Sequence, residues 1–517
     1  MKKIDFGLPI CKKFRACVDL KVSKLLDQKN PTKYRSPKIF RDAVFGFHRF
    51  RPYEINIIDN PLFQRLRYIN QTSLALFVYP SSSHSRFEHS ISCASLTTKY
   101  ADAIHQQTPD VLTPIEESEL RLAGLLHDVG HGPFSHASED FYGTNKIFAK
   151  LRQEYLELFG NPENSASEIF SFFIVTSPSF KKFFDKIRDI YKTDPKYGKI
   201  LQRINLHKVG LLILAKLHRF TDPRYLYLDQ IINGPFDVDK MDYIHRDGYF
   251  TGLDTTIDLE RFFQTVHVAS LIPGKDKRLA IDVSGVTAVE QLVFSKMLMF
   301  SVVYHHHKVR AAALALRQFF QKLSEGKWKI KGLSFKQPFD FLEINDHDVL
   351  NQIHKDKSLQ EFVTDLRNRN LPRAAVVISF RTVKDEDSRQ TFLELPEVPG
   401  TLAKMKADIV RETKVDADKI YIDIPSVPRF RAITQHGFVR ISPGELVPLE
   451  TIYPTSGWAA AYIQNRYKAY IFGPRGEMEN IAIASKRVLE KYGIRLHRHA
   501  FDLAKHDELF TKKVFKL

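Results

Sequence analysis

The densest group of chemically capable side chains lies in the run AGLLHDVGHGPFSH, residues 123–136. His127 and Asp128 are neighbours at the end of an apolar stretch, and His131 and His136 follow within nine positions. Imidazole nitrogens and carboxylate oxygens are common ligands of divalent transition metals. The run is therefore typical of a mixed nitrogen and oxygen metal site with bases beside it, an arrangement suited to water attack on a phosphate ester.

Two further segments supply the same ligand types. His89 ends the run SRFEH, residues 85–89, and Asp239 lies in the run DVDKMDY, residues 237–243. A divalent ion that activates water needs several protein ligands and at least one open position. An isolated His-Asp pair is more often a packing or capping pair than a metal site, so the surrounding sequence has to decide between the two.

The elements that position these residues are expected to be helices. Apolar residues recur at helical spacing from residue 44 to residue 322. If the helix ending near residue 126 continues, His131 returns to the face of His127. The expected helices cover residues 61–69, 91–103, 115–126, 209–217 and 291–320.

Two other patterns bear on the site. Asp239, Tyr243 and Asp247 are spaced so that they share one face of a helix. Residues 142–166 are polar and contain glycine, which predicts a loop or lid.

Beyond about residue 372 the pattern changes to that of an α+β region. Apolar and β-branched runs predict strands at 374–380, 419–424 and 467–472, and helical spacing predicts helices at 401–414 and 480–491. The charged run at 384–389 predicts an exposed hairpin or linker. The expected fold class is mainly α, with a helical core and a smaller α+β C-terminal region. The expected domains are a basic N-terminal arm at 1–43, a helical domain at 44–322, a connecting segment at 323–371 and the α+β lobe at 372–517.

Charge and composition narrow the partners. The 517-residue chain carries a net charge of +17, and residues 1–43 hold twelve lysines and arginines against four aspartates. A positive field attracts polyanions, so nucleotides and single-stranded nucleic acid are expected partners; the alternative is an arm that serves solubility alone. No run of about 18 apolar residues is free of charge, so no membrane partner is expected. Three cysteines in so long a chain predict a cytoplasmic protein without a disulfide framework.

Several long motifs, in this order, resemble the HD-domain deoxynucleoside triphosphate (dNTP) triphosphohydrolases. The similarity begins with VFGFH and PLFQRLRYINQ, continues through SHSRFEHS, peaks at HDVGHGPFSH and resumes at residues 237–247. It implies a helical HD-domain core and a metal-dependent enzyme that converts a dNTP to a deoxynucleoside and tripolyphosphate. It also implies a homo-oligomer with allosteric nucleotides as further ligands.

The resemblance also implies the role of each matching residue. The metal ligands are His89, His127, Asp128 and Asp239, and the ion is iron, manganese, zinc or magnesium. The catalytic group is His136, with His131 in the phosphate site and Glu139 holding the His136 ring. Arg86, Lys240 and Tyr243 bind the phosphates, Gln71 and Asp247 bind the sugar 3′-hydroxyl, and Tyr304, His307 and Lys308 line the nucleotide pocket.

Parts of the chain depart from the family pattern. Residues 163–167 lack the His-Glu pair that is usual in the family, and residues 72–76 are bulkier than the usual glycine-rich stretch. The helix at 297–304 is also more apolar than in the vertebrate members of the family, where arginine and histidine reach the nucleotide. These departures leave open an alternative function, an HD-type nuclease or phosphodiesterase acting on single-stranded nucleic acid or a signalling nucleotide. A non-catalytic nucleotide-binding module is a third class, which the complete ligand set disfavours.

Overall fold

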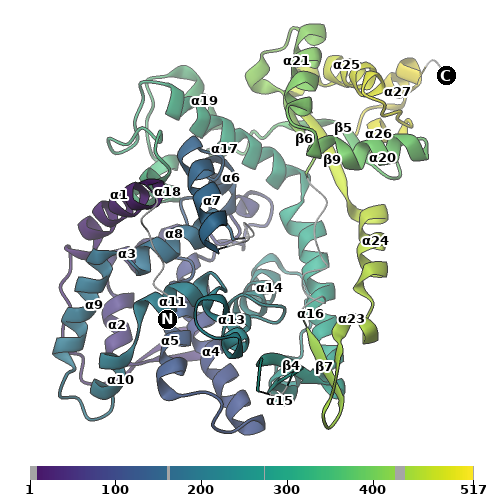
Figure 1. Ribbon diagram of the computed structural model, residues 1–517. Coiled ribbons are helices and arrows are strands. Elements are labelled where there is room, and N and C mark those ends of the chain that lie inside the picture. Colours follow the sequence, from purple (N-terminus) through teal and green to yellow (C-terminus); the bar gives the residue numbers. More distant parts are fainter. Residues whose placement is uncertain (1–8, 160–163, 273, 426–436, 516–517) are drawn as a thin grey trace. The chain divides into compact units, whose positions relative to one another are not determined.

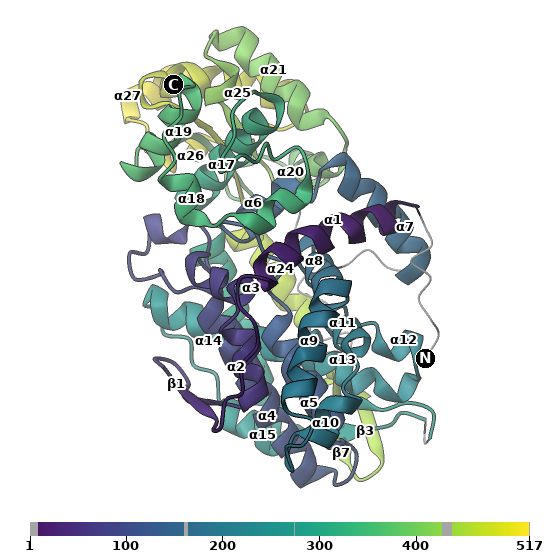
Figure 2. The same cartoon turned by 90° about the vertical axis from the view of Figure 1, so that its left-hand side faces the viewer.

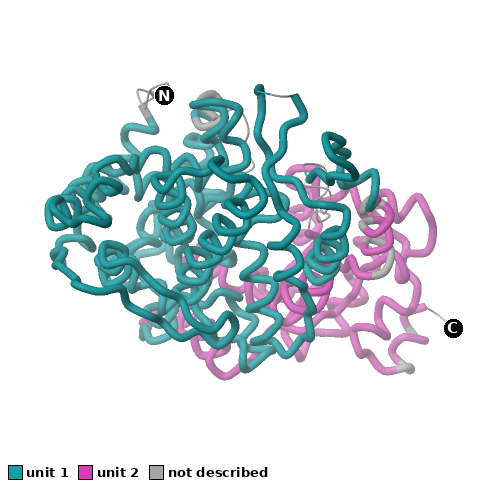
Figure 3. The backbone as a smooth tube through the Cα atoms, turned by 90° about the horizontal axis from the view of Figure 1, so that it is seen from below, with its two compact units in different colours: residues 1–296, 323–353, 432–453 teal, residues 297–322, 354–431, 454–517 magenta. Residues whose placement is uncertain are grey.

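The chain packs into two compact units (Figures 1 and 3). The computed structural model describes residues 9–159, 164–272, 274–425 and 437–515. Unit 1 comprises Met1–Lys296, Leu323–Ile353 and Ala432–Tyr453, and unit 2 comprises the remaining three segments. The four domains expected from the sequence divide the chain at other positions, and that division stays a prediction. The predicted fold class, mainly α with a smaller α+β region, is confirmed.

Three helices of unit 1 carry most of the candidate site. They are α4 (Arg86–Gln107), α5 (Pro114–Leu126) and α14 (Val238–Thr251). Each helix is preceded by a residue whose side chain accepts a hydrogen bond from a backbone N–H of the first turn. This satisfies a backbone donor that has no partner within the helix. These capping residues are Ser85, Thr113 and Asp237.

A glycine sets the separation of α4 and α5. A Cβ at Gly124 would lie 3.0 Å from the Thr97 side chain and 3.2 Å from the Cys93 backbone. Only a residue without a side chain fits this contact without displacement. The close approach brings the end of α5, which His127 and Asp128 follow, beside α4, which carries His89.

The N-terminal segment is part of the unit 1 core. Helix α1 (Pro9–Leu26) lies against α7 (Lys146–Phe159) and α8 (Ala166–Val175) (Figure 2). Its buried apolar residues recur every three or four positions, among them Phe14 and Val18, whereas Leu20 is exposed. The expectation of a basic arm is therefore corrected for these residues, because one face of the helix supplies core side chains.

The expected loop at 142–166 is also corrected. Most of it is helix α7, in which Phe148 and Leu151 are buried one turn apart. The Asn145 side chain accepts a hydrogen bond from the Ile147 amide at 2.9 Å and so starts the helix. The polar residues that suggested a loop lie between these apolar positions, as they do in any amphipathic helix.

The remaining elements of unit 1 complete the helical layer and two small sheets. Strands β1 (Lys38–Asp42) and β2 (Gly46–Phe50) form an antiparallel hairpin. Strands β3 (Val266–Ala269), β4 (Arg278–Asp282), β7 (Phe438–Ser442) and β8 (Glu445–Pro448) form a sheet in the order β3-β4-β7-β8, in which only β4 and β7 are parallel. The other helices are α2 (Pro52–Ile58), α3 (Pro61–Gln64), α6 (His136–Tyr142), α9 (Pro178–Ile190), α10 (Gly198–Arg203), α11 (Leu206–Ile213), α12 (Leu217–Phe220), α13 (Leu226–Ile232), α15 (Leu259–Thr265), α18 (Asp346–Leu350) and α23 (Leu449–Ile452).

Unit 2 contains the predicted α+β elements. An antiparallel sheet in the order β5-β9-β6 packs its apolar side chains with flanking helices. The predicted strands and helices at 374–491 are confirmed as β5 (Arg373–Ser379), β6 (Tyr421–Asp423), β9 (Lys468–Gly473), α21 (Thr401–Thr413) and α25 (Met478–Lys491). The other helices are α19 (Lys357–Arg367), α20 (Glu386–Glu394), α24 (Thr455–Arg466), α26 (His499–Asp502) and α27 (Glu508–Phe515).

The charged run at 384–389 is not a hairpin or linker. It begins helix α20, and the Asp385 side chain accepts a hydrogen bond from the Ser388 amide at 3.0 Å. Acidic residues in the first turn of a helix interact favourably with its dipole, which explains why this charged run is helical.

The expected continuous helix at 291–320 is interrupted. Helix α16 (Val286–Met299) passes into a π-helical turn at Phe300–Tyr304, and α17 (His307–Glu325) follows. Among the described residues, Val283–Tyr304 is the one helical stretch that could cross a membrane by length and composition alone. Half of that stretch is buried inside the structure, as in a core helix.

Candidate active site

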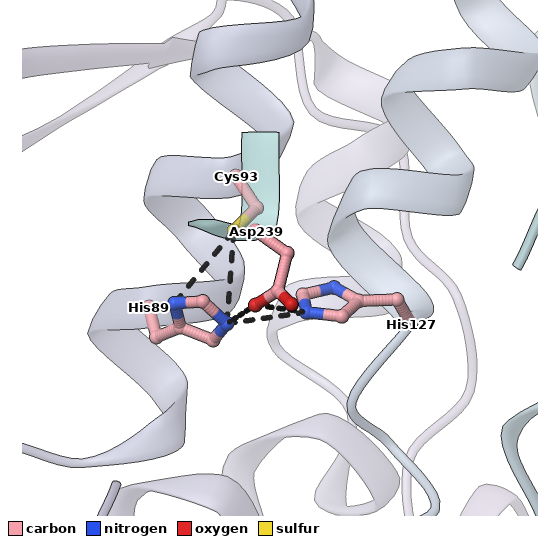
Figure 4. Close-up of side chains that lie close together, drawn as sticks. All are labelled: His89, Cys93, His127 and Asp239. Carbon is pink, nitrogen blue, oxygen red and sulfur yellow. Dashed lines mark hydrogen bonds and ion pairs between the residues drawn. The ribbon is translucent and has the colours of Figure 1, made fainter. Parts of the chain in front are cut away.

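Three side chains from separate elements converge on one point (Figure 4). His89 comes from α4, His127 follows the last residue of α5, and Asp239 lies in the first turn of α14. His89 Nε2 is 3.1 Å from both His127 Nε2 and Asp239 Oδ1, and the last two atoms are 3.7 Å apart. Two ligand atoms of a tetrahedral ion, each about 2.1 Å from it, lie roughly 3.4 Å apart. The three side chains therefore fit one divalent ion.

Asp128 reaches the same cluster. One of its carboxylate oxygens is 3.5 Å from His89 Nε2, and the other is 3.5 Å from His127 Nε2. Burial raises the pKa of Asp128, but the charges of Arg86 and the neighbouring histidines outweigh burial and hold this pKa well below its usual range. All four predicted metal ligands are thus close together, and Asp128 is a carboxylate there.

A chain of buried charges fixes the His89 ring. His89 Nδ1 lies 2.6 Å from Asp242 Oδ2, and Asp242 accepts hydrogen bonds from Arg246 at 3.0 Å. On its other side, Arg246 forms an ion pair with Asp42 at 2.8 Å. His127 is fixed more simply, with Nδ1 2.8 Å from the Gly124 carbonyl. Because each Nδ1 has a partner, each Nε2 is left to face the ligand cluster.

The segment after α5 is a turn and not a further helical turn. His131 therefore reaches the site by a different route from the one expected, with Nε2 3.4 Å from Asp128 Oδ1. A Cβ at Gly130 would lie 2.2 Å from the Ser167 carbonyl oxygen, so glycine allows α8 to pack against this turn. Burial, together with the charge of Arg86, lowers the pKa of His131 to about 4 and keeps its ring neutral.

Arg86 is held by two partners and keeps one donor unused. Its Nε donates to Ser135 Oγ at 2.8 Å, and Nη1 donates to Asp128 at 2.5 Å. Its Nη2 is buried and has no hydrogen-bond partner among the described residues. The Nδ1 atom of His131 is also buried and has no hydrogen-bond partner among the described residues. Buried polar atoms without partners are costly, so these two atoms point to a polar ligand that binds here.

His136 and Glu139 form a pair at the start of α6. His136 Nδ1 is 2.9 Å from Glu139 Oε2, and 70% of the His136 side chain is exposed. Loss of hydration lowers the pKa of His136, but the hydrogen bond and the charge of Glu139 outweigh it and raise this pKa. The Ser167 amide donates to Glu139 at 2.9 Å and its hydroxyl at 3.1 Å. In the segment that lacks the family histidine, Ser167 thus anchors Glu139, while Glu163 lies outside the described residues.

Tyr243 and Asp247 follow Asp239 on one face of α14, as expected from their spacing, and Lys240 lies next to Asp239 in the first turn. The Lys240 ammonium contacts Asp237 and donates to the Gly234 carbonyl at 3.0 Å. Burial and nearby carboxylates raise the pKa of Tyr243, so its hydroxyl stays protonated.

A second polar group lies around Asp247. Its Oδ1 is 2.7 Å from His84 Nε2, and the backbone N–H of Gln71 donates to the backbone carbonyl of His84 at 3.0 Å. The Gln71 side-chain oxygen is buried and has no hydrogen-bond partner among the described residues. The two residues predicted to bind the sugar therefore lie together, with His84 between them.

The structure adds residues that the sequence analysis did not single out. His84, Asp242 and Arg246 lie within the matched motifs, so their positions beside a ligand were an available signal. Lys296 is a further cation near Lys240, and burial together with Lys240 lowers its pKa to about 8. No sequence signal marks Lys296 or the pairing of Asp42 with Arg246, because both depend on the fold.

The remaining predicted substrate residues belong to unit 2. His307 and Lys308 line a cavity of about 870 Å³ within that unit, whereas Tyr304 lies in the π-helical turn. Burial and neighbouring cations lower the pKa of Lys308 to about 8. The other basic residues that line the cavity are Arg373, Lys468, Arg475, Lys505 and His506. Two acidic residues, Glu479 and Asp507, also line it, so the lysines and arginines leave a net positive charge that suits an anion.

Comparison with known proteins decides the family. A family model of the HD domain matches residues 86–247, and a model of the HD-associated region matches residues 257–491. The chain belongs to the HD-domain phosphohydrolase family. The HD-domain match contains all four predicted metal ligands, and the resemblance stated from the sequence motifs is confirmed.

Some proteins with similar sequences are named deoxynucleoside triphosphate triphosphohydrolases. The deoxynucleoside triphosphate triphosphohydrolase SAMHD1 homolog of Dictyostelium discoideum is 28% identical over 404 residues, covering 75% of this chain and 70% of that protein. The mouse deoxynucleoside triphosphate triphosphohydrolase SAMHD1 is 26% identical and covers 79% of this chain and 63% of the mouse protein. An uncharacterized protein of Methanocaldococcus jannaschii is 25% identical and covers 92% and 89% of the two chains.

Proposed function

We propose that this HD-domain protein is a metal-dependent dNTP triphosphohydrolase, which releases a deoxynucleoside and tripolyphosphate. The observation that carries the proposal is the set of unsatisfied buried atoms around the ligand cluster. Arg86 Nη2 is placed to donate to a phosphate oxygen, and Gln71 Oε1 is placed to accept from a hydroxyl donor. The names of the two dNTP triphosphohydrolase relatives support the same substrate class.

The metal centre would be formed by His89, His127, Asp128 and Asp239. A divalent ion bound there would lower the pKa of a coordinated water and polarise a phosphate oxygen. The mixed imidazole and carboxylate set suits iron, manganese or zinc better than magnesium alone. The buried Asp42–Arg246–Asp242 chain keeps the His89 ring in one orientation and so preserves the ligand geometry.

Arg86 and His136 act on the α-phosphate. Arg86 is anchored by Ser135 and Asp128, so its free donor can meet an oxygen that gains charge during attack. His136 is exposed, held by Glu139 and favoured in its protonated form. It can therefore protonate the 5′-oxygen as that oxygen leaves, which general acids do most effectively when their pKa lies near the working pH.

Gln71 and Asp247 would favour a nucleotide over a simple phosphate ester. The Gln71 side-chain oxygen can accept a hydrogen bond from the sugar 3′-hydroxyl, and Asp247 lies across His84 from it. Tyr243 and Lys240, also on α14, extend the polar surface towards the phosphates.

Regulatory nucleotides are expected in the basic cavity of unit 2. Five lysines and arginines, among them Lys308 and Arg373, line it together with the acidic Glu479 and Asp507, and its volume of about 870 Å³ can hold a nucleoside triphosphate. Homo-oligomerisation and binding of single-stranded nucleic acid remain expectations from the family resemblance and from the basic net charge.

A chromatographic product assay tests the proposal. Protein loaded with Mn²⁺ is incubated with equal amounts of the four dNTPs and a labelled single-stranded oligonucleotide. We expect deoxynucleosides and tripolyphosphate in equal amounts, an intact oligonucleotide, and no products from Asp128→Ala. Cleavage of the oligonucleotide without nucleoside release would instead support the nuclease alternative and overturn the proposal.

A further inference from the structure

A buried carboxylate outside the metal cluster joins two segments that carry site residues. Asp346 is the first residue of α18 and is 2% exposed. Its Oδ1 accepts a hydrogen bond from the Phe134 backbone N–H at 2.6 Å, and its Oδ2 accepts one from the Asn70 backbone N–H at 3.0 Å. We propose that Asp346 is a positioning residue, which holds the turn at Phe134–Ser135 so that His136 is directed at the leaving oxygen. This role rests on the proposed function, in which His136 is the general acid.

The turn before His136 has a backbone conformation that side chains disfavour. Phe134 has a φ of 56°, and Ser135 has a φ of 50° with a ψ of −126°. Residues other than glycine rarely adopt such angles, and they keep them only where surrounding contacts hold them. One such contact falls on the first of the two residues, since the Phe134 N–H donates to Asp346. Because Ser135 directly precedes α6, its torsion angles set the direction in which the helix and His136 begin.

A closed circuit of hydrogen bonds connects the turn to the carboxylate. The Ser135 hydroxyl donates to the Asn70 carbonyl, and the Asn70 N–H donates back to Asp346. With its proton directed to Asn70, the Ser135 oxygen accepts from Arg86 Nε at 2.8 Å. Asp346 closes the circuit from both sides, so the loss of either of its two bonds opens it. Arg86 is also held by Asp128, so an open circuit affects Arg86 less than it affects the turn.

Capping of its own helix does not explain Asp346. Helix α18 is capped by Asn345, whose side chain accepts from the Asp348 amide at 3.1 Å. Burial raises the pKa of Asp346 to about 7, although the two backbone N–H groups and the charge of Arg86 lower it. Burying a carboxylate is costly, so its place against two donors indicates that it serves to hold them. The competing explanation is that Asp346 only fastens α18 to the core, which would affect stability and not turnover in particular.

Asp346→Asn removes one acceptor while keeping the shape of the side chain. The amide NH₂ group would face one of the two backbone N–H groups, so two donors would meet and the circuit would open. Asp348→Asn is the matched control, because Asp348 belongs to the same helix and pairs with Lys331 at 2.7 Å. Ser135→Ala opens the circuit at the hydroxyl and should also lower kcat. It is measured in parallel, so that the test does not depend on the folding of one variant.

Steady-state kinetics and hydrogen exchange on the full-length, Mn²⁺-loaded protein test the role. Asp346→Asn should lower kcat about 10–100-fold, since a displacement of about 1 Å can cost roughly 100-fold, while KM and Mn²⁺ affinity change less than about threefold. Backbone hydrogen exchange at Phe134 should become faster, and Asp348→Asn should change none of these quantities. In a His136→Ala background, Asp346→Asn should lower kcat less than about threefold further, because the group that it positions is already missing.

Other results would overturn the role of Asp346. An unchanged kcat in Asp346→Asn would show that His136 is not positioned by the carboxylate, even if exchange at Phe134 became faster. A full additional loss in the His136→Ala background, or an equal loss of kcat in Asp348→Asn, would assign Asp346 to general stability. If wild type turns over no dNTP, the proposed function fails. Exchange at Phe134 then decides whether Asp346 holds the turn, since faster exchange in Asp346→Asn supports this contact and unchanged exchange overturns it.

Discussion

The structure makes a quantitative prediction for Asp242→Asn. The Asp242 carboxylate lies 2.6 Å from His89 Nδ1 and accepts two hydrogen bonds of 3.0 Å from Arg246. Neither Asp242 nor Arg246 is accessible to solvent to any useful degree. The substitution keeps the shape of the side chain but removes its charge. The new amide NH₂ group would face either His89 Nδ1 or Arg246, so that two donors would meet there.

The expected losses can be worked out from these contacts. Breaking a buried ion pair by removing one partner costs about 3–5 kcal/mol. The lower end applies here, because Asp42 still pairs with Arg246 at 2.8 Å. Loss of a partner that orients a metal-bound histidine weakens metal binding about 10–100-fold. Asp242→Asn should therefore lower the free energy of unfolding by about 3 kcal/mol and weaken Mn²⁺ binding by at least about tenfold.

A matched control separates metal binding from general damage. Glu54 and Arg121 form another buried pair in unit 1, with two hydrogen bonds of 2.8 Å, and neither touches the metal cluster. Glu54→Gln should lower stability by a comparable amount and leave Mn²⁺ affinity unchanged. Chelator competition and chemical unfolding measure the two quantities on each variant. If Asp242→Asn weakens metal binding no more than Glu54→Gln does, the assigned role of the buried chain is refuted.

Three further predictions address the acid, the turn and the basic cavity. Glu139→Gln removes the charge that raises the pKa of His136, so the imidazolium loses its proton at lower pH. The basic limb of the pH–rate profile should therefore move to lower pH. An unmoved limb would exclude His136 as the general acid. Gly130→Ala would push a Cβ to 2.2 Å from the Ser167 carbonyl oxygen and should lower the free energy of unfolding by about 1–3 kcal/mol, as measured in denaturant titrations. The control Gly476→Ala has open space for its Cβ and should leave the free energy of unfolding unchanged. Lys308→Ala should weaken the binding of a nucleoside triphosphate at the cavity about tenfold in calorimetry without affecting Mn²⁺ affinity, and unchanged nucleotide binding would contradict an anion site there.

The spacing of apolar residues within short segments predicted the helices and strands that depend on it. The helices around His89 and His127 and the strands of unit 2 follow from apolar spacing, and the motifs specify which side chains converge. The sequence failed where a polar run hides an amphipathic helix, as in α7, or where one capping residue changes the outcome, as with Asp385 before α20.

The contacts that join distant segments could not be predicted from the sequence. Arg246 pairs with an aspartate some 200 positions earlier in the chain, and Ser167 anchors Glu139 from a different helix. Such contacts depend on how helices pack, and that is not encoded by spacing within any one of them.

The most direct test of the metal-dependent phosphohydrolase is a metal titration that follows occupancy and turnover in the same samples. Metal-free wild type and Asp239→Ala receive increasing Mn²⁺ with a dNTP mixture, and bound metal and released deoxynucleoside are measured together. Nucleoside release in wild type should rise in proportion to metal bound at the His89–His127–Asp239 cluster, and Asp239→Ala should show neither. Turnover in metal-free protein, or undiminished turnover in Asp239→Ala, would contradict the assignment of this cluster as the catalytic centre.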